Sequence, residues 1–175
     1  HFYAGISYAL KARLHALREE RLAIARAGVR GREHMLRAIA LDPDFADAYM
    51  GIGLYNYYVD TLSGIARVLR WFMGIPGGSK SEGIRQLERA IAAGGMSAVE
   101  ARFYLAVNLR DHDRQYERAA QLLEPLVMEY PESPLFHLQL GSMYAKLARK
   151  EKAAAQFEAA ERLASEGKIA DPACA

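Results

Sequence analysis

The chain has 175 residues, of which 51% are hydrophobic, and this is enough to bury one sizeable core. Its 23 Lys and Arg residues nearly balance 21 Asp and Glu residues, so the sequence carries no electrostatic signal for nucleic-acid binding. The single cysteine, Cys174, excludes an intramolecular disulfide framework. No apolar run reaches the ~18 residues of a membrane span. Because the sequence opens at His1 without Met, we expect a soluble fragment of a longer chain and predict no compartment.

The first element is expected to be one long helix over residues 2–26. Its apolar residues recur at intervals of three, four or seven, which predicts a single buried stripe. The stripe consists of Ile6, Leu10, Leu14, Leu17 and Ile24. A turn over 28–31 and a short helix to Leu41 follow, and Asp42-Pro43-Asp44 ends this N-terminal helix pair, residues 1–43.

Helices over 45–60 and 81–93 are expected on either side of an insertion, residues 61–81. The insertion places apolar residues at helical spacing, with Arg67 and Arg70 opposite them. Its docking residues are expected to be Val68, Trp71 and Phe72. Such an amphipathic helix needs a partner for its apolar face. The partner is the chain's own helices, another protein, a second copy of the chain, or a membrane surface, for which two arginines are few.

Residues 74–81, Gly-Ile-Pro-Gly-Gly-Ser-Lys-Ser, nearly fit a phosphate-binding loop. Ser79, however, replaces the glycine that lets the backbone wrap a phosphate, and no β-strand precedes the segment. We therefore interpret it as a turn in which Ser79 and Glu82 form a capping box at the start of the next helix. Exposed N–H groups and Lys80 leave a weak anion site at this helix start as an open alternative.

Further helices are expected over 98–111, 115–129, 134–147 and 150–165, and no stretch alternates as a strand does. In these helices small, large, small and helix-breaking positions recur in the same order. The series Ala119, Leu123, Leu126 and Pro131 repeats as Ala153, Phe157, Ala160 and Ser165. This fixed period of 34 residues is typical of a two-helix unit that buries its apolar face only by stacking on its copies.

The stretch over 134–144 resembles the first helix of a tetratricopeptide repeat, through Leu140, Gly141 and Tyr144, with His137 at the usual aromatic position. More degenerate copies surround Ile52-Gly53 and Leu105-Ala106. The resemblance implies an all-α fold, an α–α superhelix of about four helix pairs. After the N-terminal pair, repeats are expected at 44–95, which includes the insertion, at 99–131 and at 134–166, before a tail at 167–175.

In this family the first helices of the repeats line a concave groove that receives an extended peptide or a helix. The resemblance implies that the groove is lined here by Met50, Leu54, Tyr57, Tyr58, Tyr104, Asn108, Gln139, Ser142 and Lys146. Apolar and tyrosine side chains dominate, and the Lys and Asn clamp with which chaperone-binding members hold a carboxylate is not present. The partner is thus expected to be a protein or peptide with apolar or aromatic anchors.

No set of residues predicts catalysis, a cofactor or a metal. Asp111-His112-Asp113 lies in an expected turn without further ligands, and His15, His34 and His137 lack acidic or cysteine partners at ligand spacing. We therefore predict a non-enzymatic module that binds a peptide or helix of another protein. The alternative is a structural or oligomerisation domain whose groove is sealed by its own insertion, with a homodimer formed through the insertion.

Overall fold

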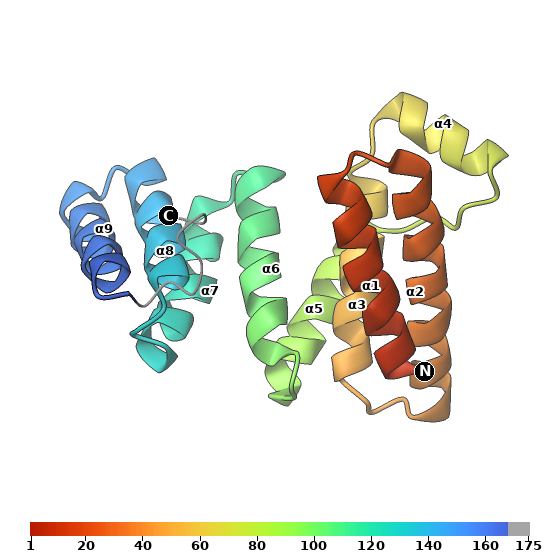
Figure 1. Cartoon of the computed structure of the whole chain (residues 1–175), viewed down its shortest axis with the longest axis horizontal. Coiled ribbons are helices and arrows are strands. Elements are labelled where there is room, and N and C mark those ends of the chain that lie inside the picture. The colour runs from red at the N-terminus through yellow and green to blue at the C-terminus, as the bar shows by residue number, and fades with distance from the viewer. Residues whose placement is uncertain (168–175) are drawn as a thin grey trace. The chain divides into compact units, whose positions relative to one another are not determined.

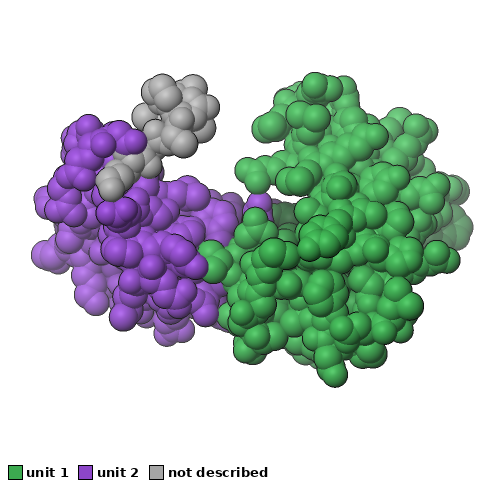
Figure 2. Space-filling view, turned by 60° about the horizontal axis from the view of Figure 1, so that its bottom comes forward, with its two compact units in different colours: residues 1–101 green, residues 102–175 purple. Residues whose placement is uncertain are grey.

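The computed structural model describes residues 1–167, apart from the side chains of Ile65 and Leu69, so Cys174 and most of the expected tail lie outside the described residues. The described chain is all helical, as predicted, and contains no strand. It forms two compact units, residues 1–101 and 102–175 (Figure 2). The helices, labelled in Figure 1, are α1 (Phe2–Leu17), α2 (Arg21–Leu41), α3 (Asp47–Asp60), α4 (Gly64–Phe72), α5 (Lys80–Ala93), α6 (Ala98–Asp111), α7 (Tyr116–Glu129), α8 (Pro134–Lys146) and α9 (Lys150–Ser165).

In unit 1, α2 packs against α1 and α3, and α3 packs against α5. One core methionine, Met35 of α2, occupies space that two glycines leave open. A Cβ atom at Gly5 of α1 would lie 2.8 Å from the Met35 Cε, and a Cβ atom at Gly51 of α3 would lie 2.9 Å from it. The surrounding core contains the buried residues Phe2, Ala38, Ala48 and Ile52. Small residues on α1 and α3 thus let a long side chain on α2 join three helices.

The predicted long helix over 2–26 is wrong, because the chain reverses after Leu17 and α2 begins at Arg21. Glu19 has a left-handed backbone with φ of 56°, and the N–H of Glu20 donates a 3.0 Å hydrogen bond to the carbonyl oxygen of His15. A left-handed residue commonly ends a helix, but it is usually glycine or asparagine. The reversal of the chain could therefore not be predicted from the residue type of Glu19.

The predicted turn over 28–31 is also wrong, since α2 runs through Gly28 and Gly31. Gly31 is buried, and a Cβ atom there would lie 3.5 Å from the carbonyl oxygen of Gly5. Both glycines therefore lie inside a helix and do not form a turn. The predicted buried stripe is wrong as well, because it assumed one continuous helix over 2–26. α2 folds back on the face of α1 that carries Gly5. The side chains of Leu10, Leu14 and Leu17 are therefore left exposed.

The two ends of the insertion meet where α3 and α5 cross. A Cβ atom at Gly53 would lie 2.9 Å from the carbonyl oxygen of Gly83, and a Cβ atom at Gly83 would lie 2.6 Å from the carbonyl oxygen of Gly53. Only glycine allows two helix backbones to approach this closely. The insertion thus leaves the body of unit 1 and rejoins it at one place.

In unit 2, α8 packs against both α7 and α9, and the helix bounds agree with the predicted ranges to within one residue. Gly141 of α8 faces the second helix of its pair, since a Cβ atom there would lie 2.7 Å from the Cε1 of Phe157. His137 is buried, and its Nε2 donates a 3.0 Å hydrogen bond to the carbonyl oxygen of Pro131. The small-against-large pairing inferred from the repeat period is therefore present in the structure.

Gly83→Ala is expected to lower the free energy of unfolding by about 1–3 kcal/mol, because the added Cβ meets backbone atoms that cannot move aside. The matched control is Gly64→Ala, where a Cβ meets nothing within 4 Å, and it is expected to be neutral or slightly stabilising. Equilibrium urea unfolding measures both. Wild-type stability in Gly83→Ala would contradict the close crossing of α3 and α5.

Candidate functional site

Four of the predicted contact residues lie on α3, and the structure divides them. Tyr57 and Met50 are buried, with 0% and 6% of their surface exposed, whereas Leu54 is half-buried and Tyr58 is exposed. Tyr57 lies at the α3–α5 crossing, where a Cβ atom at Gly83 would lie 2.8 Å from its backbone nitrogen. The expectation that Tyr57 and Met50 face a partner is therefore corrected: both serve packing. Of the four residues, only Leu54 and Tyr58 have side chains that are accessible to a partner.

The other predicted contact residues lie in unit 2. Asn108 of α6 is buried, so its side chain belongs to the packing of the unit. Tyr104 on the same helix is half-buried. On α8, Gln139 and Ser142 are half-buried and Lys146 is exposed. A role in binding for these accessible side chains stays a prediction.

The insertion helix α4 exposes its predicted docking residues. Val68 is 56% exposed, Trp71 75% and Phe72 74%. The rings of Trp71 and Phe72 pack edge to face with centroids 5.0 Å apart, so they form one aromatic surface. In Figure 1, α4 projects from the end of unit 1 at which α1 passes into α2. We call Val68, Trp71 and Phe72 the α4 patch.

The chain after α4 is fixed by backbone geometry and by one tyrosine. Gly74 is left-handed, with φ of 64°, and its N–H donates to the carbonyl oxygen of Trp71 at 3.1 Å. The N–H of Ile75 donates to the carbonyl oxygen of Arg70 at 3.0 Å, which completes a glycine-terminated helix end. The hydroxyl of Tyr55 on α3 then donates to the carbonyl oxygen of Pro76 at 2.9 Å. The loop is thus attached to the body of unit 1.

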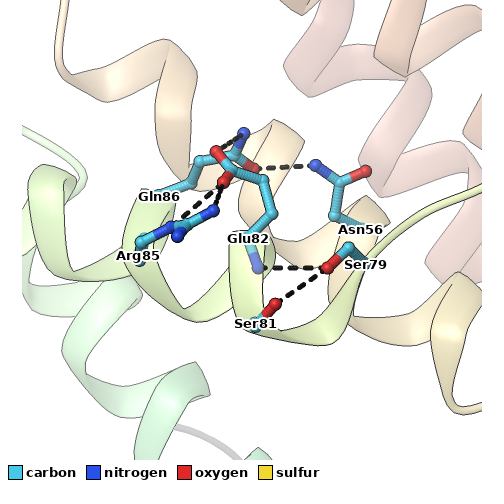
Figure 3. A network of polar contacts seen from close by, with 6 residues as sticks. All are labelled: Asn56, Ser79, Ser81, Glu82, Arg85 and Gln86. Carbon is cyan, nitrogen blue, oxygen red and sulfur yellow. Dashed lines mark hydrogen bonds and ion pairs between the residues drawn. The ribbon is translucent and has the colours of Figure 1, made fainter.

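A polar network holds the start of α5 against α3 (Figure 3). Ser79 caps α5, since its hydroxyl accepts a hydrogen bond from the N–H of Glu82 at 3.4 Å, which is one of the two bonds of the predicted capping box. The Glu82 carboxylate accepts a hydrogen bond from Gln86 at 2.9 Å, and the Gln86 side-chain oxygen accepts one from Asn56 of α3 at 2.9 Å. The network joins the two helices at the base of the insertion.

The alternative anion site at the start of α5 is not favoured by these contacts. The N–H of Lys80 donates to the Asp60 carboxylate at 2.8 Å, and the N–H of Glu82 is taken by Ser79. Helix termini bind anions through N–H groups that lack such partners. Residues 74–81 therefore resemble a phosphate-binding loop in sequence but do not present free N–H groups at Lys80 and Glu82 for a phosphate.

Tyr55 is not among the predicted contact residues, and two arginine side chains lie near it. The guanidinium carbon of Arg32 on α2 lies 5.5 Å from the centroid of the Tyr55 ring. Burial raises the pKa of Tyr55, and the charges of Arg32 and Arg70 act in the opposite direction. Helices α2, α3 and α4 thus each contribute one side chain to this point, and arginines so far apart in sequence carry no pattern by which to find it.

Other chemistry-bearing residues have structural partners. The Asp111 carboxylate accepts hydrogen bonds from the Arg110 guanidinium at 2.6 Å and 3.0 Å, and these bonds lower the pKa of Asp111. In residues 1–167, no three His, Cys, Asp or Glu side chains gather as metal ligands would. Within the same range no helix combines the length and apolarity needed to cross a bilayer.

The packed helix pairs define a protein built from helical repeats, and known proteins identify the repeat. Residues 107–168 match the family model of the tetratricopeptide repeat. Over 93% of its length the chain is similar to the crystal structure of MamA protein, of which 93% is covered, with a TM-score of 0.58 and 16% identity. This likeness shows the fold alone. No curated protein matches the sequence. Residues 107–168 thus match tetratricopeptide repeats, and such repeats are generally modules for protein interaction.

Alkaline pH is expected to destabilise unit 2 through Tyr144. Its hydroxyl donates to the Glu124 carboxylate at 2.8 Å, and burial together with this bond raises its pKa from 10 to about 12. Because the folded chain keeps a proton that the unfolded chain releases, stability falls as the pH rises from 10 towards 12. Tyr144→Phe removes this titration, so its free energy of unfolding is expected to fall less over that interval. Urea unfolding at a series of pH values tests this, and equal pH dependence in both proteins would contradict the raised pKa.

Proposed function

We propose that the chain is a non-enzymatic interaction module that binds a peptide or helix of another protein through the α4 patch. The observation that carries the proposal is the exposure of Trp71 and Phe72, at 75% and 74%. Large aromatic side chains at this exposure, in contact with each other, are the residues that contribute most to protein interfaces when they become buried. The family assignment supports the class of function.

The length of α4 supports the same proposal. An isolated helix of nine residues gains too little from its own hydrogen bonds to be stable in water. The helix is held instead at its ends, by Ser63 before it and Gly74 after it. Its order therefore does not require that Trp71 or Phe72 be buried within the chain, and both remain available to a partner.

The same exposure argues against the groove-sealing alternative, because a helix that closes a groove buries the aromatic side chains it brings there. The predicted groove contributes fewer accessible residues than expected, since Tyr57 and Met50 are buried. Tyr58 and Leu54 in unit 1 remain secondary candidates for contact with the partner. A second copy of the chain as the partner is one outcome of the experiments below.

Trp71 is the only tryptophan and reports directly on the insertion. In the free protein we expect red-shifted emission that acrylamide quenches readily, because the indole is exposed to water. Trp71→Phe gives the blank for tyrosine emission. Blue-shifted emission that resists the quencher would instead show that the insertion packs on its own chain, as the sealed-groove alternative requires.

Replacing Trp71 and Phe72 together by Ser is expected to abolish capture of the partner from extracts of the source cells. The matched control is Leu17→Ser, which removes a side chain of unit 1 that is 79% exposed but lies on α1. Each captured protein is identified by mass spectrometry, and light scattering shows whether the chain captures itself. Equal capture by the double variant and the control would contradict binding through the α4 patch.

A further inference from the structure

One face of α1 is apolar and exposed. The side chains of Leu10, Leu14 and Leu17 are 61%, 47% and 79% exposed, although their spacing predicts a buried stripe. The opposite face of α1 carries the buried residues Phe2 and Gly5, and it packs against α2. A helix at the end of a stack normally turns a polar face to water, so the exposed leucines call for a partner.

The exposed face has the spacing of a seam between two helices. Its members follow each other at intervals of four, three, four and three residues, which keeps them on one narrow face of α1. A helix that packs against a core has a wider apolar face. A single helix is therefore the shape that fits this face. We call this set the α1 seam; it consists of Tyr3, Ser7, Leu10, Leu14 and Leu17, all of which are exposed.

Basic side chains flank the α1 seam on both sides. In the seven-residue register that the seam defines, Lys11 and Arg18 occupy flanking positions on one side, and Arg13 occupies a flanking position on the other. All three side chains are exposed, and α1 contains no Asp or Glu. Charges at such flanking positions determine which partner helix is accepted. The positive charge on both sides of the seam therefore favours a partner with negative charge on both sides of its own seam.

We infer that the α1 seam docks an amphipathic helix of another protein, with apolar side chains along its seam and Asp or Glu on both sides. Two copies of α1 would bring Lys11, Arg13 and Arg18 of one chain against the same residues of the other, and these like charges repel. A helix that lies on a bilayer needs a larger apolar face than this narrow seam. The seam lies on a different helix from the α4 patch, so this docking goes beyond the proposed function and does not depend on it.

Two capped peptides test this docking. One consists of three copies of Glu-Leu-Ala-Ala-Leu-Glu-Gln, and its twin has Lys in place of every Glu. Both carry the same leucine seam, and like charges keep each peptide from pairing with itself. Binding is followed by the NMR signals of the α1 backbone amides at constant ionic strength. The acidic peptide is expected to bind at least about tenfold more tightly than the basic twin, with saturable shifts along α1.

Leu14→Ser is expected to weaken binding of the acidic peptide at least about tenfold, because it removes an apolar side chain from the middle of the seam. The matched control is Leu41→Ser, which removes a side chain of α2 that is 77% exposed and lies outside the seam, and it is expected to leave binding unchanged. Replacing Lys11 and Arg18 together by Glu is expected to reverse the preference between the two peptides. Thermal unfolding of each variant confirms that it is folded.

Trp71→Ser separates this surface from the α4 patch. It is expected to leave binding of the acidic peptide unchanged, whereas loss of binding in this variant would place the peptide on the α4 patch and overturn the docking on α1. In the capture experiment above, Leu17→Ser is expected to retain the protein that the Trp71 and Phe72 double variant loses, because the two surfaces lie on different helices.

Equal binding of the two peptides would overturn the preference for an acidic helix, and so would failure of both to bind. Light scattering that shows a dimer for the wild-type chain and a monomer for Leu14→Ser would identify a second copy as the occupant and overturn the inference. Binding to vesicles of phosphatidylcholine and phosphatidylglycerol that Leu14→Ser abolishes would identify a membrane surface instead, and would likewise overturn it.

Discussion

The arrangement of unit 1 depends on the contact between α3 and α5 at Gly53 and Gly83. Backbone lies against backbone there, so the two helices are neighbours whatever the chain does between them. Everything from Asp60 to Ser79 has to leave this helix pair and return to the same place. Its apolar residues cannot enter a pair that is already closed, and they must be accommodated outside it.

The polar contacts at the base of the insertion decide which part of it is fixed. Asn56 and Gln86 join α3 to α5, and Tyr55 fixes the loop after α4 through the Pro76 carbonyl. The polar contacts that fix the insertion thus act at its base and on its loop, while the rings of Trp71 and Phe72 remain exposed. The insertion is therefore a short helix on two anchored ends, and this geometry gives the chain a surface that the repeats alone do not have.

Where the repeat is regular, the sequence predicts the structure closely. The helices of unit 2 follow from the 34-residue period and from breakers such as Pro131, because each small position has to face the helix that crosses it. The N-terminal pair was not predictable in this way. A glycine can lie in a turn or inside a helix, and Gly31 lies inside α2. The left-handed conformation of Glu19 could not be predicted, because glutamate rarely adopts it.

The candidate site shows the same limit. Helical spacing predicts that α4 is amphipathic, because apolar periodicity is local, but it does not predict whether the apolar face is buried or exposed. The burial of Tyr57 follows from the α3–α5 crossing, and the grouping of Arg32, Tyr55 and Arg70 depends on side chains that come from three different helices. A surface helix normally turns apolar residues inwards and arginines outwards; α4 instead exposes Trp71 and Phe72 and buries donor atoms of Arg70. Exposure of the two rings is unfavourable in the free chain, and a partner segment that covers them removes that cost.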